Sequence, residues 1–259
     1  MINLEIDGMK TRVPEGTTVL EAANGLGIHI PTLCYHKALS MYASCRVCIV
    51  EMSIEKRGKL RNWVDASCVY QVEEGLIVKT NSTRVQKERK LIIALLLSRA
   101  PDSPVLNDLA RKYGAQKERF QTIDSGESNC ILCGLCVRVC NELIQAGAIG
   151  TAFRGIHKKV VTPYLIAKDL CIGCGACAYV CPTGAINVVT GKEKLRVENW
   201  HAELEMKLCK QCGNPIGPKI HIDKVREKVD LRGDLYDLCP NCRRKIYRNF
   251  TGAGGAEIS

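Results

Sequence analysis

The sequence predicts an α+β chain of small modules in series, each held together by cysteine side chains. Three observations support this fold class: apolar residues that alternate at the N-terminus, a cysteine motif that occurs twice, and two C-x2-C pairs in the last quarter. Aromatic residues make up only 5% of the 259 residues, which is too few for one large core. Sixteen cysteines, in contrast, are enough to hold several small modules together through metal centres.

The repeated motif reads C-x2-C-x2-C-x3-C and predicts two [4Fe–4S] clusters. The first copy starts at Cys130 and the second at Cys171. In such a duplicated motif the fourth cysteine of each copy ligates the other cluster. We therefore expect two ligand sets, Cys130, Cys133, Cys136 and Cys181 in one, and Cys171, Cys174, Cys177 and Cys140 in the other. A disulfide framework or paired zinc sites would not explain why the same run of gaps occurs twice.

Residues 1–82 have the pattern of a β-grasp domain. Apolar residues alternate over 2–6, and Asp7-Gly8 then predicts a hairpin turn. Thr18 and Glu21 form a capping box at the start of a helix that we expect to stop at Gly25 to Gly27. A hairpin followed by a packed helix is the usual opening of a β-grasp fold.

Four further cysteines follow this helix with the spacing C-x10-C-x2-C-x19-C. They are Cys34, Cys45, Cys48 and Cys68. Three ligands from one long loop and a fourth from a separate strand is the layout of a plant-type [2Fe–2S] site, although its first gap is normally x4. The spacing alone leaves a zinc site open as the alternative. His29 and His36 flank this loop, and we interpret both as loop residues rather than ligands.

The segments around these cysteines, namely 30–36, 44–51, 66–68 and 74–78, resemble a known family. They are similar to the N-terminal domain of the large iron–sulfur subunit of NADH dehydrogenase (complex I). The same domain occurs in the diaphorase subunit of NAD-linked hydrogenases and at the N-terminus of iron-only hydrogenases and some formate dehydrogenases. The resemblance implies a [2Fe–2S] cluster on Cys34, Cys45, Cys48 and Cys68. The long final gap is expected to contain an extended hairpin.

Residues 83–128 are expected to form a helical linker, with two helices separated at Pro101. In the resembling family this stretch carries a third cluster, bound by one histidine and three cysteines. Here Ala100 stands at the histidine position, and Ser103 and Leu106 stand at the first two cysteine positions. We therefore expect the helical scaffold without that cluster.

The two-cluster ferredoxin domain is expected over 129–190, with a closing strand at 185–189. The remaining residues, 191–259, carry two C-x2-C pairs formed by Cys209, Cys212, Cys239 and Cys242. Paired knuckles of this kind favour one tetrahedral zinc ion in a small ribbon-like module. Rubredoxin-like iron or another iron–sulfur cluster are the alternatives. Residues 251–259 are rich in glycine and are expected to be disordered.

These centres predict a relay of single electrons rather than a self-sufficient enzyme. The sequence has no dinucleotide-binding G-x-G-x-x-G after a strand and no P-loop. A nicotinamide exchanges hydride, so a flavin is needed to separate the electrons. We therefore expect FMN and NAD(P) only on a flavoprotein partner of the NADH-dehydrogenase type. The resemblance also implies a catalytic partner of the hydrogenase, formate dehydrogenase or aldehyde oxidoreductase type, and an electron-bifurcating complex would add ferredoxin.

Charge and hydropathy argue against other classes. The formal charge is +10, but four tetrathiolate centres at about −2 each would lower it to about +2. No dense basic block remains for nucleic acid, no apolar run is long enough for a membrane span, and no signal peptide is recognisable. Cysteines used for metal indicate the cytoplasm. A free-standing ferredoxin-like carrier is the alternative function, and a zinc-based nucleic-acid or scaffold protein is a third class.

Overall fold

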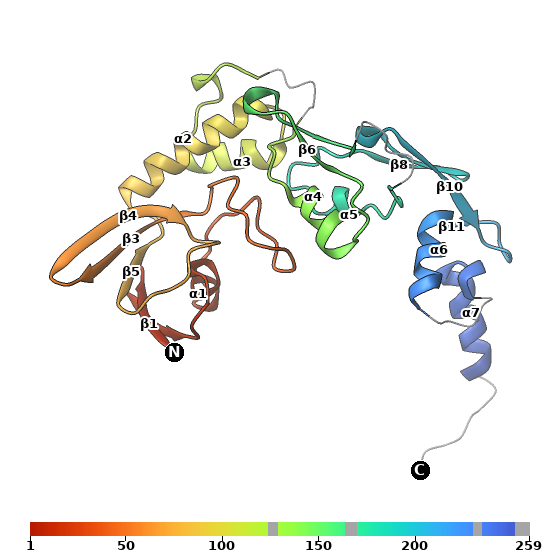
Figure 1. The fold of residues 1–259 in the computed structure, drawn as a ribbon, viewed down its shortest axis with the longest axis horizontal. Coiled ribbons are helices and arrows are strands. Elements are labelled where there is room, and N and C mark those ends of the chain that lie inside the picture. The colour runs from red at the N-terminus through yellow and green to blue at the C-terminus, as the bar shows by residue number, and fades with distance from the viewer. Residues whose placement is uncertain (124–128, 164–169, 230–234, 252–259) are drawn as a thin grey trace, which may run out of the picture.

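The structure is a computed structural model that describes residues 1–123, 129–163, 170–229 and 235–251. These residues form an arch (Figure 1). The N-terminal sheet stands at one foot, the two cysteine motifs lie near the middle, and the last helices stand at the other foot. Residues 124–128 of the predicted linker and residues 252–259 of the glycine-rich tail lie outside the described residues.

The N-terminal domain is a five-stranded mixed sheet with the order β2-β1-β5-β3-β4. Strand β1 pairs antiparallel with β2 and parallel with β5, while β3 pairs antiparallel with both β5 and β4. The hairpin predicted at Asp7-Gly8 is confirmed, because Ile6 pairs with Met9 across it. The extended hairpin predicted in the long cysteine gap is also confirmed by the β3–β4 pairing. The bounds are β1 Ile2–Ile6, β2 Met9–Val13, β3 Ile49–Lys56, β4 Lys59–Ala66 and β5 Leu76–Lys79.

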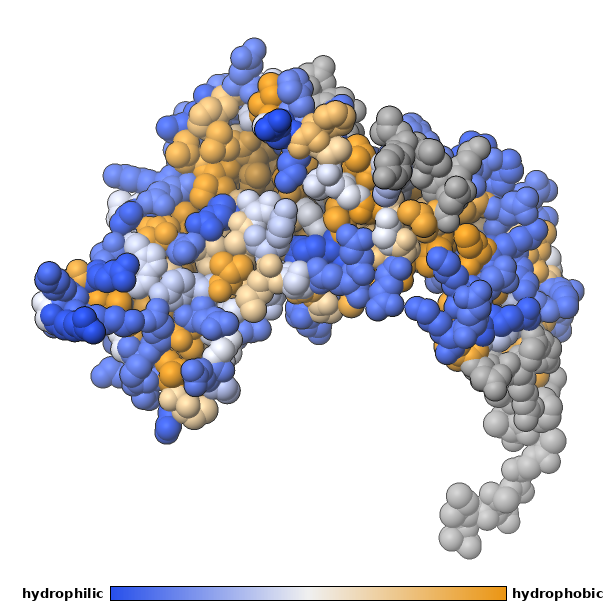
Figure 2. Space-filling view, viewed as in Figure 1, coloured by the Kyte–Doolittle hydropathy of each residue, from blue (hydrophilic) through white to orange (hydrophobic). Residues whose placement is uncertain are grey.

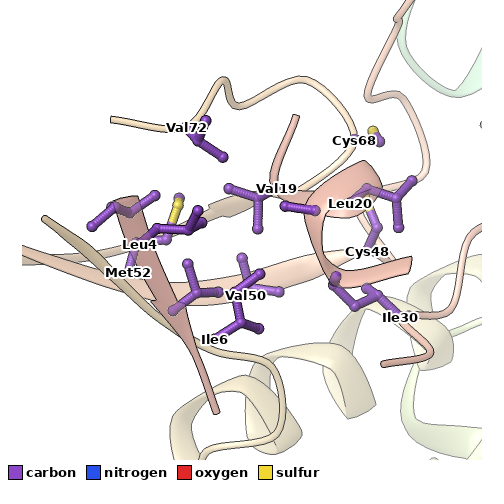
Figure 3. Close-up of a cluster of buried hydrophobic side chains, with 14 of the residues drawn as sticks. Leu4, Ile6, Val19, Leu20, Ile30, Cys48, Val50, Met52, Cys68 and Val72 are labelled. Carbon is purple, nitrogen blue, oxygen red and sulfur yellow. The ribbon is translucent and has the colours of Figure 1, made fainter. Parts of the chain in front are cut away.

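Helix α1 (Val19–Gly25) covers one side of this sheet and closes its core. The predicted capping box is confirmed: the Glu21 amide donates to Thr18 Oγ1 at 3.2 Å, and the Thr18 amide donates to the Glu21 carboxylate at 2.9 Å. The core contains Cys48 and Cys68 beside aliphatic side chains of the sheet and the helix (Figure 3). Two predicted metal ligands are therefore part of the hydrophobic core of this domain.

Helices α2 (Thr83–Arg99) and α3 (Pro104–Tyr113) follow, separated at Pro101 as predicted. Arg89 of α2 is 1% exposed and donates to three main-chain oxygens, those of Val47 at 3.0 Å, Ile49 at 2.6 Å and Thr80 at 3.3 Å. This buried guanidinium attaches α2 to the end of the loop that carries Cys34, Cys45 and Cys48. A short 3-10 turn, η1 (Lys117–Arg119), comes after α3.

The positions that would carry the third cluster in the resembling family lie inside a packed core. Ala100, Ser103 and Leu106 are each 0% exposed. Ala100 and Leu106 belong to one apolar cluster with Ile93 and Leu97 of α2. Apolar packing thus fills the space between α2 and α3.

The ferredoxin region is built around two short helices, one for each cysteine motif. The hairpin β6–β7 lies between the motifs. The elements of the ferredoxin region, in chain order, are α4 Leu135–Arg138, the π-helical turn η2 Val139–Leu143, β6 Gly150–Ala152, the 3-10 turn η3 Gly155–His157, β7 Lys159–Val161 and α5 Ala176–Tyr179.

A four-stranded antiparallel sheet of order β11-β10-β9-β8 leads into the C-terminal helices. Strand β8 overlaps the predicted closing strand, but its partner is β9, so this sheet crosses residue 190, where we expected a domain boundary. The bounds are β8 Val188–Thr190, β9 Lys194–Val197, the 3-10 turn η5 Glu198–Trp200, β10 Ala202–Leu208, β11 Pro215–Pro218, α6 Lys219–Lys228, the 3-10 turn η6 Leu235–Asp237 and α7 Pro240–Thr251.

The molecular surface is mainly hydrophilic in the view of Figure 2, with hydrophobic residues gathered over helices α2 and α3. Leu91 and Leu95 of α2 contribute to the exposed apolar area, at 36% and 48% exposure. Within the described part of the chain, no helix has both the length and the apolar character to cross a bilayer.

Candidate metal centres

The first centre lies where the long loop before β3 meets the turn after β4. Cys34, Cys45, Cys48 and Cys68 are each at most 4% exposed. A hydrogen bond from the Cys45 thiol lowers the pKa of Cys34 to about 6, and one from Cys68 lowers the pKa of Cys48 to about 7. The Cys45 amide also donates to Cys34 Sγ at 3.5 Å. These hydrogen bonds favour the thiolate form of Cys34 and Cys48, the form that binds iron or zinc.

The two repeated motifs fold in the same way. In each copy a glycine with positive φ starts the short helix, Gly134 at 75° and Gly175 at 72°. The left-handed conformation suits glycine and turns the chain tightly around the first three cysteines. At Gly134 a side chain would also meet a neighbour, because an added Cβ would lie 3.0 Å from Cε1 of Tyr42. The loop of the first centre therefore packs directly on the first ferredoxin motif.

Two cavities lie between the motifs, and each is lined by four cysteines. The larger, of about 360 Å³, is lined by Cys130, Cys133, Cys136 and Cys181. The smaller, of about 30 Å³, is lined by Cys140, Cys171, Cys174 and Cys177. Each cavity thus takes three cysteines from one motif and the last cysteine from the other.

The centres adjoin one another through individual sulfurs. Burial raises the pKa of the Cys133 thiol to about 12, and the neighbouring thiols, including Cys34 of the first centre, act in the same direction. Burial likewise raises the pKa of Cys136, and Cys177 of the other cavity is among its electrostatic neighbours. Packing agrees with this proximity: Cys34 and Cys45 share a buried cluster with Cys133, and Cys136 shares one with cysteines of the smaller cavity.

The C-terminal centre consists of Cys209, Cys212, Cys239 and Cys242. Their four sulfurs all lie within 4.8 Å of one another. The Cys239 amide donates to Cys209 Sγ at 3.3 Å, and this bond is the main reason that the pKa of Cys209 is lowered, to about 6. The set joins the end of β10 to the start of α7.

This compactness distinguishes the C-terminal set from the other three. A tetrahedral ion with metal–sulfur bonds of about 2.3 Å requires sulfurs about 4 Å apart. Among the residues that the structure describes, Cys209, Cys212, Cys239 and Cys242 are the only histidine, cysteine or acidic group that meets such a limit. The four sulfurs of each of the other three sets do not all lie within that limit of one another.

Three functional neighbours were not recognised from the sequence. Arg138 is 8% exposed and crosses to the first loop, where it donates to the Cys34 oxygen at 2.6 Å and to the Ser40 oxygen. Arg99 donates to the Cys130 oxygen at 3.2 Å. Trp200 is 5% exposed and lines both cavities. The sequence holds no signal for these contacts, because a single arginine or tryptophan outside a motif does not reveal whether its side chain is buried or what it contacts.

No histidine belongs to a metal-binding group among the residues that the structure describes. His36 accepts a hydrogen bond from the Ala38 amide at 3.2 Å, in keeping with its interpretation as a loop residue. His201 lies at the edge of the larger cavity. Burial lowers the pKa of His221 in α6.

Comparison with known proteins agrees with the two kinds of cluster. Residues 1–83 match a family of 2Fe-2S iron-sulfur cluster binding domains, and residues 164–187 match a family of 4Fe-4S binding domains. The chain is also similar to a crystal structure of a NAD+-reducing [NiFe]-hydrogenase in the H2-reduced state. The TM-score is 0.58 at 26% identity, over 71% of this chain and 86% of that chain.

Curated relatives are longer proteins. A NADH-quinone oxidoreductase subunit of Rhizobium meliloti is 32% identical over 82% of this chain. NADP-reducing hydrogenase subunit HndD of Solidesulfovibrio fructosivorans is 37% identical over 72%, and NADPH-Fe(3+) oxidoreductase subunit alpha of Geobacter sulfurreducens is 32% identical over 94%. The chain spans 27 to 36% of the length of these relatives. It carries 2Fe-2S and 4Fe-4S domains and is similar, as its sequence predicts, to the iron–sulfur subunits of complex I and of NAD(P)-linked hydrogenases.

Proposed function

We propose that this chain is an electron-transfer subunit of a multisubunit NAD(P)-linked oxidoreductase. It relays single electrons between a flavoprotein partner and a catalytic partner. The observation that carries this proposal is the packing of the three cysteine groups: Cys34 shares one buried cluster with Cys133, and Cys136 shares another with Cys177. Clusters bound to neighbouring thiolates lie close together, as a one-electron relay requires.

Three clusters fit the three groups. We assign a [2Fe–2S] cluster to Cys34, Cys45, Cys48 and Cys68. The sulfurs of this set are not all as close as a single ion requires, which disfavours the zinc alternative. We assign two [4Fe–4S] clusters to the cysteines that line the two cavities.

The domains follow from these assignments. Residues 1–82 are a β-grasp [2Fe–2S] domain, because one helix packs on a mixed sheet in which the first and last strands run parallel. Residues 83–128 form the linker, 129–190 the two-cluster ferredoxin domain, and 191–259 the C-terminal module. The module is closely attached to the ferredoxin domain, since sheet β8–β11 crosses residue 190.

The C-terminal centre holds one zinc ion in this proposal. Its sulfurs have the compact spacing of a mononuclear site, which supports zinc or a single iron over a further cluster. A zinc ion does not change its oxidation state, so this module is structural and holds α7 against the end of β10. The electron path then ends at the smaller cavity.

The partners follow from the chemistry and from the relatives. A two-electron hydride donor needs a flavin to divide its electrons, so FMN and NAD(P) are placed on a flavoprotein of the NADH-dehydrogenase type. A hydrogenase, formate dehydrogenase or aldehyde oxidoreductase supplies the other end, and a bifurcating assembly adds ferredoxin. Sixteen cysteines used as thiolates are consistent with a reducing cytoplasm.

Native anaerobic purification with metal analysis tests the proposal. About ten iron atoms and one zinc per chain are expected from one [2Fe–2S], two [4Fe–4S] and one tetrathiolate site. A flavoprotein and a catalytic subunit should co-elute. An iron-rich chain that elutes alone would instead indicate a free-standing carrier, and an iron-free chain would contradict the electron-transfer role.

A further inference from the structure

Trp200 occupies a position between the two cysteine-lined cavities. Its side chain is 5% exposed and belongs to the lining of both. It comes from turn η5 of the C-terminal sheet, outside the duplicated cysteine motifs. The C-terminal module thus contributes a side chain to the ferredoxin centres.

A set of hydrogen bonds fixes this turn. The Asn199 side chain donates to the Ala185 oxygen at 3.0 Å, and its own oxygen accepts from the Asn187 amide at 2.8 Å. The Glu198 amide donates to the Asn187 oxygen at 3.1 Å. Residues 185–187 follow directly after the last cysteine motif, so the indole is anchored to the region that it covers.

Sheet β8–β11 also packs closely on the second cysteine motif, at Gly173. A Cβ added at Gly173, between Cys171 and Cys174, would lie 2.5 Å from Leu204 Cδ1 and 2.9 Å from Pro218 Cγ. Leu204 and Pro218 belong to the same sheet that carries Trp200. The sheet is therefore seated against the second motif, with little freedom for the indole to move away.

The indole N–H of Trp200 is a buried donor that lacks an acceptor of good hydrogen-bond geometry among the described residues. Cys177, one of the four thiols of the smaller cavity, lines that cavity together with Trp200 and packs in the same buried cluster. A buried N–H without an acceptor costs free energy, and a sulfur that carries negative charge would relieve that cost.

We propose that Trp200 donates its indole N–H to the sulfur of Cys177 when a [4Fe–4S] cluster occupies the smaller cavity, and thereby raises the reduction potential of that cluster. This inference rests on the proposed function. An N–H dipole directed at sulfur stabilises the added electron, and hydrogen bonds to sulfur and exclusion of solvent are established determinants of cluster potential. Trp200 is a positioning residue that acts on the cluster through its ligand.

Redox titration of the full chain, followed by EPR, tests this role in Trp200→Phe. Phenylalanine keeps an apolar ring over the cavity and removes the donor. The potential of one [4Fe–4S] cluster should become more negative by about 59 mV, a tenfold fall in its one-electron reduction constant, while the other two clusters keep their potentials. Trp63→Phe is the matched control, because Trp63 packs on Tyr70 in the N-terminal domain, and it should leave both [4Fe–4S] potentials unchanged.

A second measurement does not depend on how Trp200→Phe folds. Only two tryptophans are present, so Trp63→Phe labelled with ¹⁵N-indole tryptophan reports Trp200 alone. Pulsed EPR of the reduced protein should then show the ¹⁵N coupled to a [4Fe–4S] cluster. Unshifted potentials in folded Trp200→Phe, or the absence of this coupling, would overturn the inference with the clusters still present. Absence of iron from the native chain would contradict the proposed function instead.

Discussion

Arg138 holds the loop of the first centre against the ferredoxin domain, and its replacement by methionine should weaken that contact strongly. The guanidinium lies between Cys136 and Cys140 in the sequence and donates to the main-chain oxygens of Cys34 and Ser40. It also lies 5.3 Å from the ring centre of Tyr42. The residue thus contacts the first centre from a position between cysteines of both cavities.

The expected loss is worked from these contacts. Each buried oxygen left without a donor costs about 1–3 kcal/mol, and the cation–π contact contributes about 0.5–1 kcal/mol. Methionine carries no charge, so the variant is relieved of the cost of burying a guanidinium, which offsets part of this loss. Arg138→Met should therefore lower the free energy of unfolding by about 2–4 kcal/mol.

Guanidinium chloride unfolding under anaerobic conditions, followed by cluster absorbance, measures this loss. Arg46→Met is the matched control. Arg46 lies in the loop that Arg138 contacts, but its side chain is 46% exposed and pairs with Asp65. An exposed pair of this kind contributes at most about 1 kcal/mol. Equal destabilisation by the two variants would refute the role given to Arg138.

Three further predictions concern the other centres. Gly173→Ala should destabilise the protein by about 1–3 kcal/mol more than Gly175→Ala. Both glycines have positive φ, 65° and 72°, but only at Gly173 would an added Cβ meet side chains of the C-terminal sheet. Equal unfolding midpoints for the two variants would contradict this contact. Cys45→Ser should abolish the [2Fe–2S] EPR signal alone, and loss of both [4Fe–4S] signals from a folded variant would show that the ligand sets are wrong. Cys239→Ser should remove about one zinc per chain and make α7 susceptible to limited proteolysis, while the iron content is unchanged. A parallel loss of iron would indicate that this centre is not a separate zinc site.

Much of the local structure could be predicted from the sequence. The hairpin at Asp7-Gly8, the capping box at Thr18 and the helix break at Pro101 all appear where the pattern places them. Each depends on residues close together in the chain, so neighbouring side chains are enough to specify it. The partner of strand β8 was not foreseen, because a single strand does not encode which sheet it joins.

The same division applies to the centres. The sequence by itself grouped the cysteines and predicted iron–sulfur clusters of two kinds, in agreement with the matched 2Fe-2S and 4Fe-4S domain families. The spacing left the metal open at the first and last cysteine sets. Only the tertiary structure decided the order of the centres and what surrounds them. The contacts of Arg138 with Cys34 and of Trp200 with both cavities join segments distant in the chain, and such contacts arise from the packing of whole domains rather than from any local pattern.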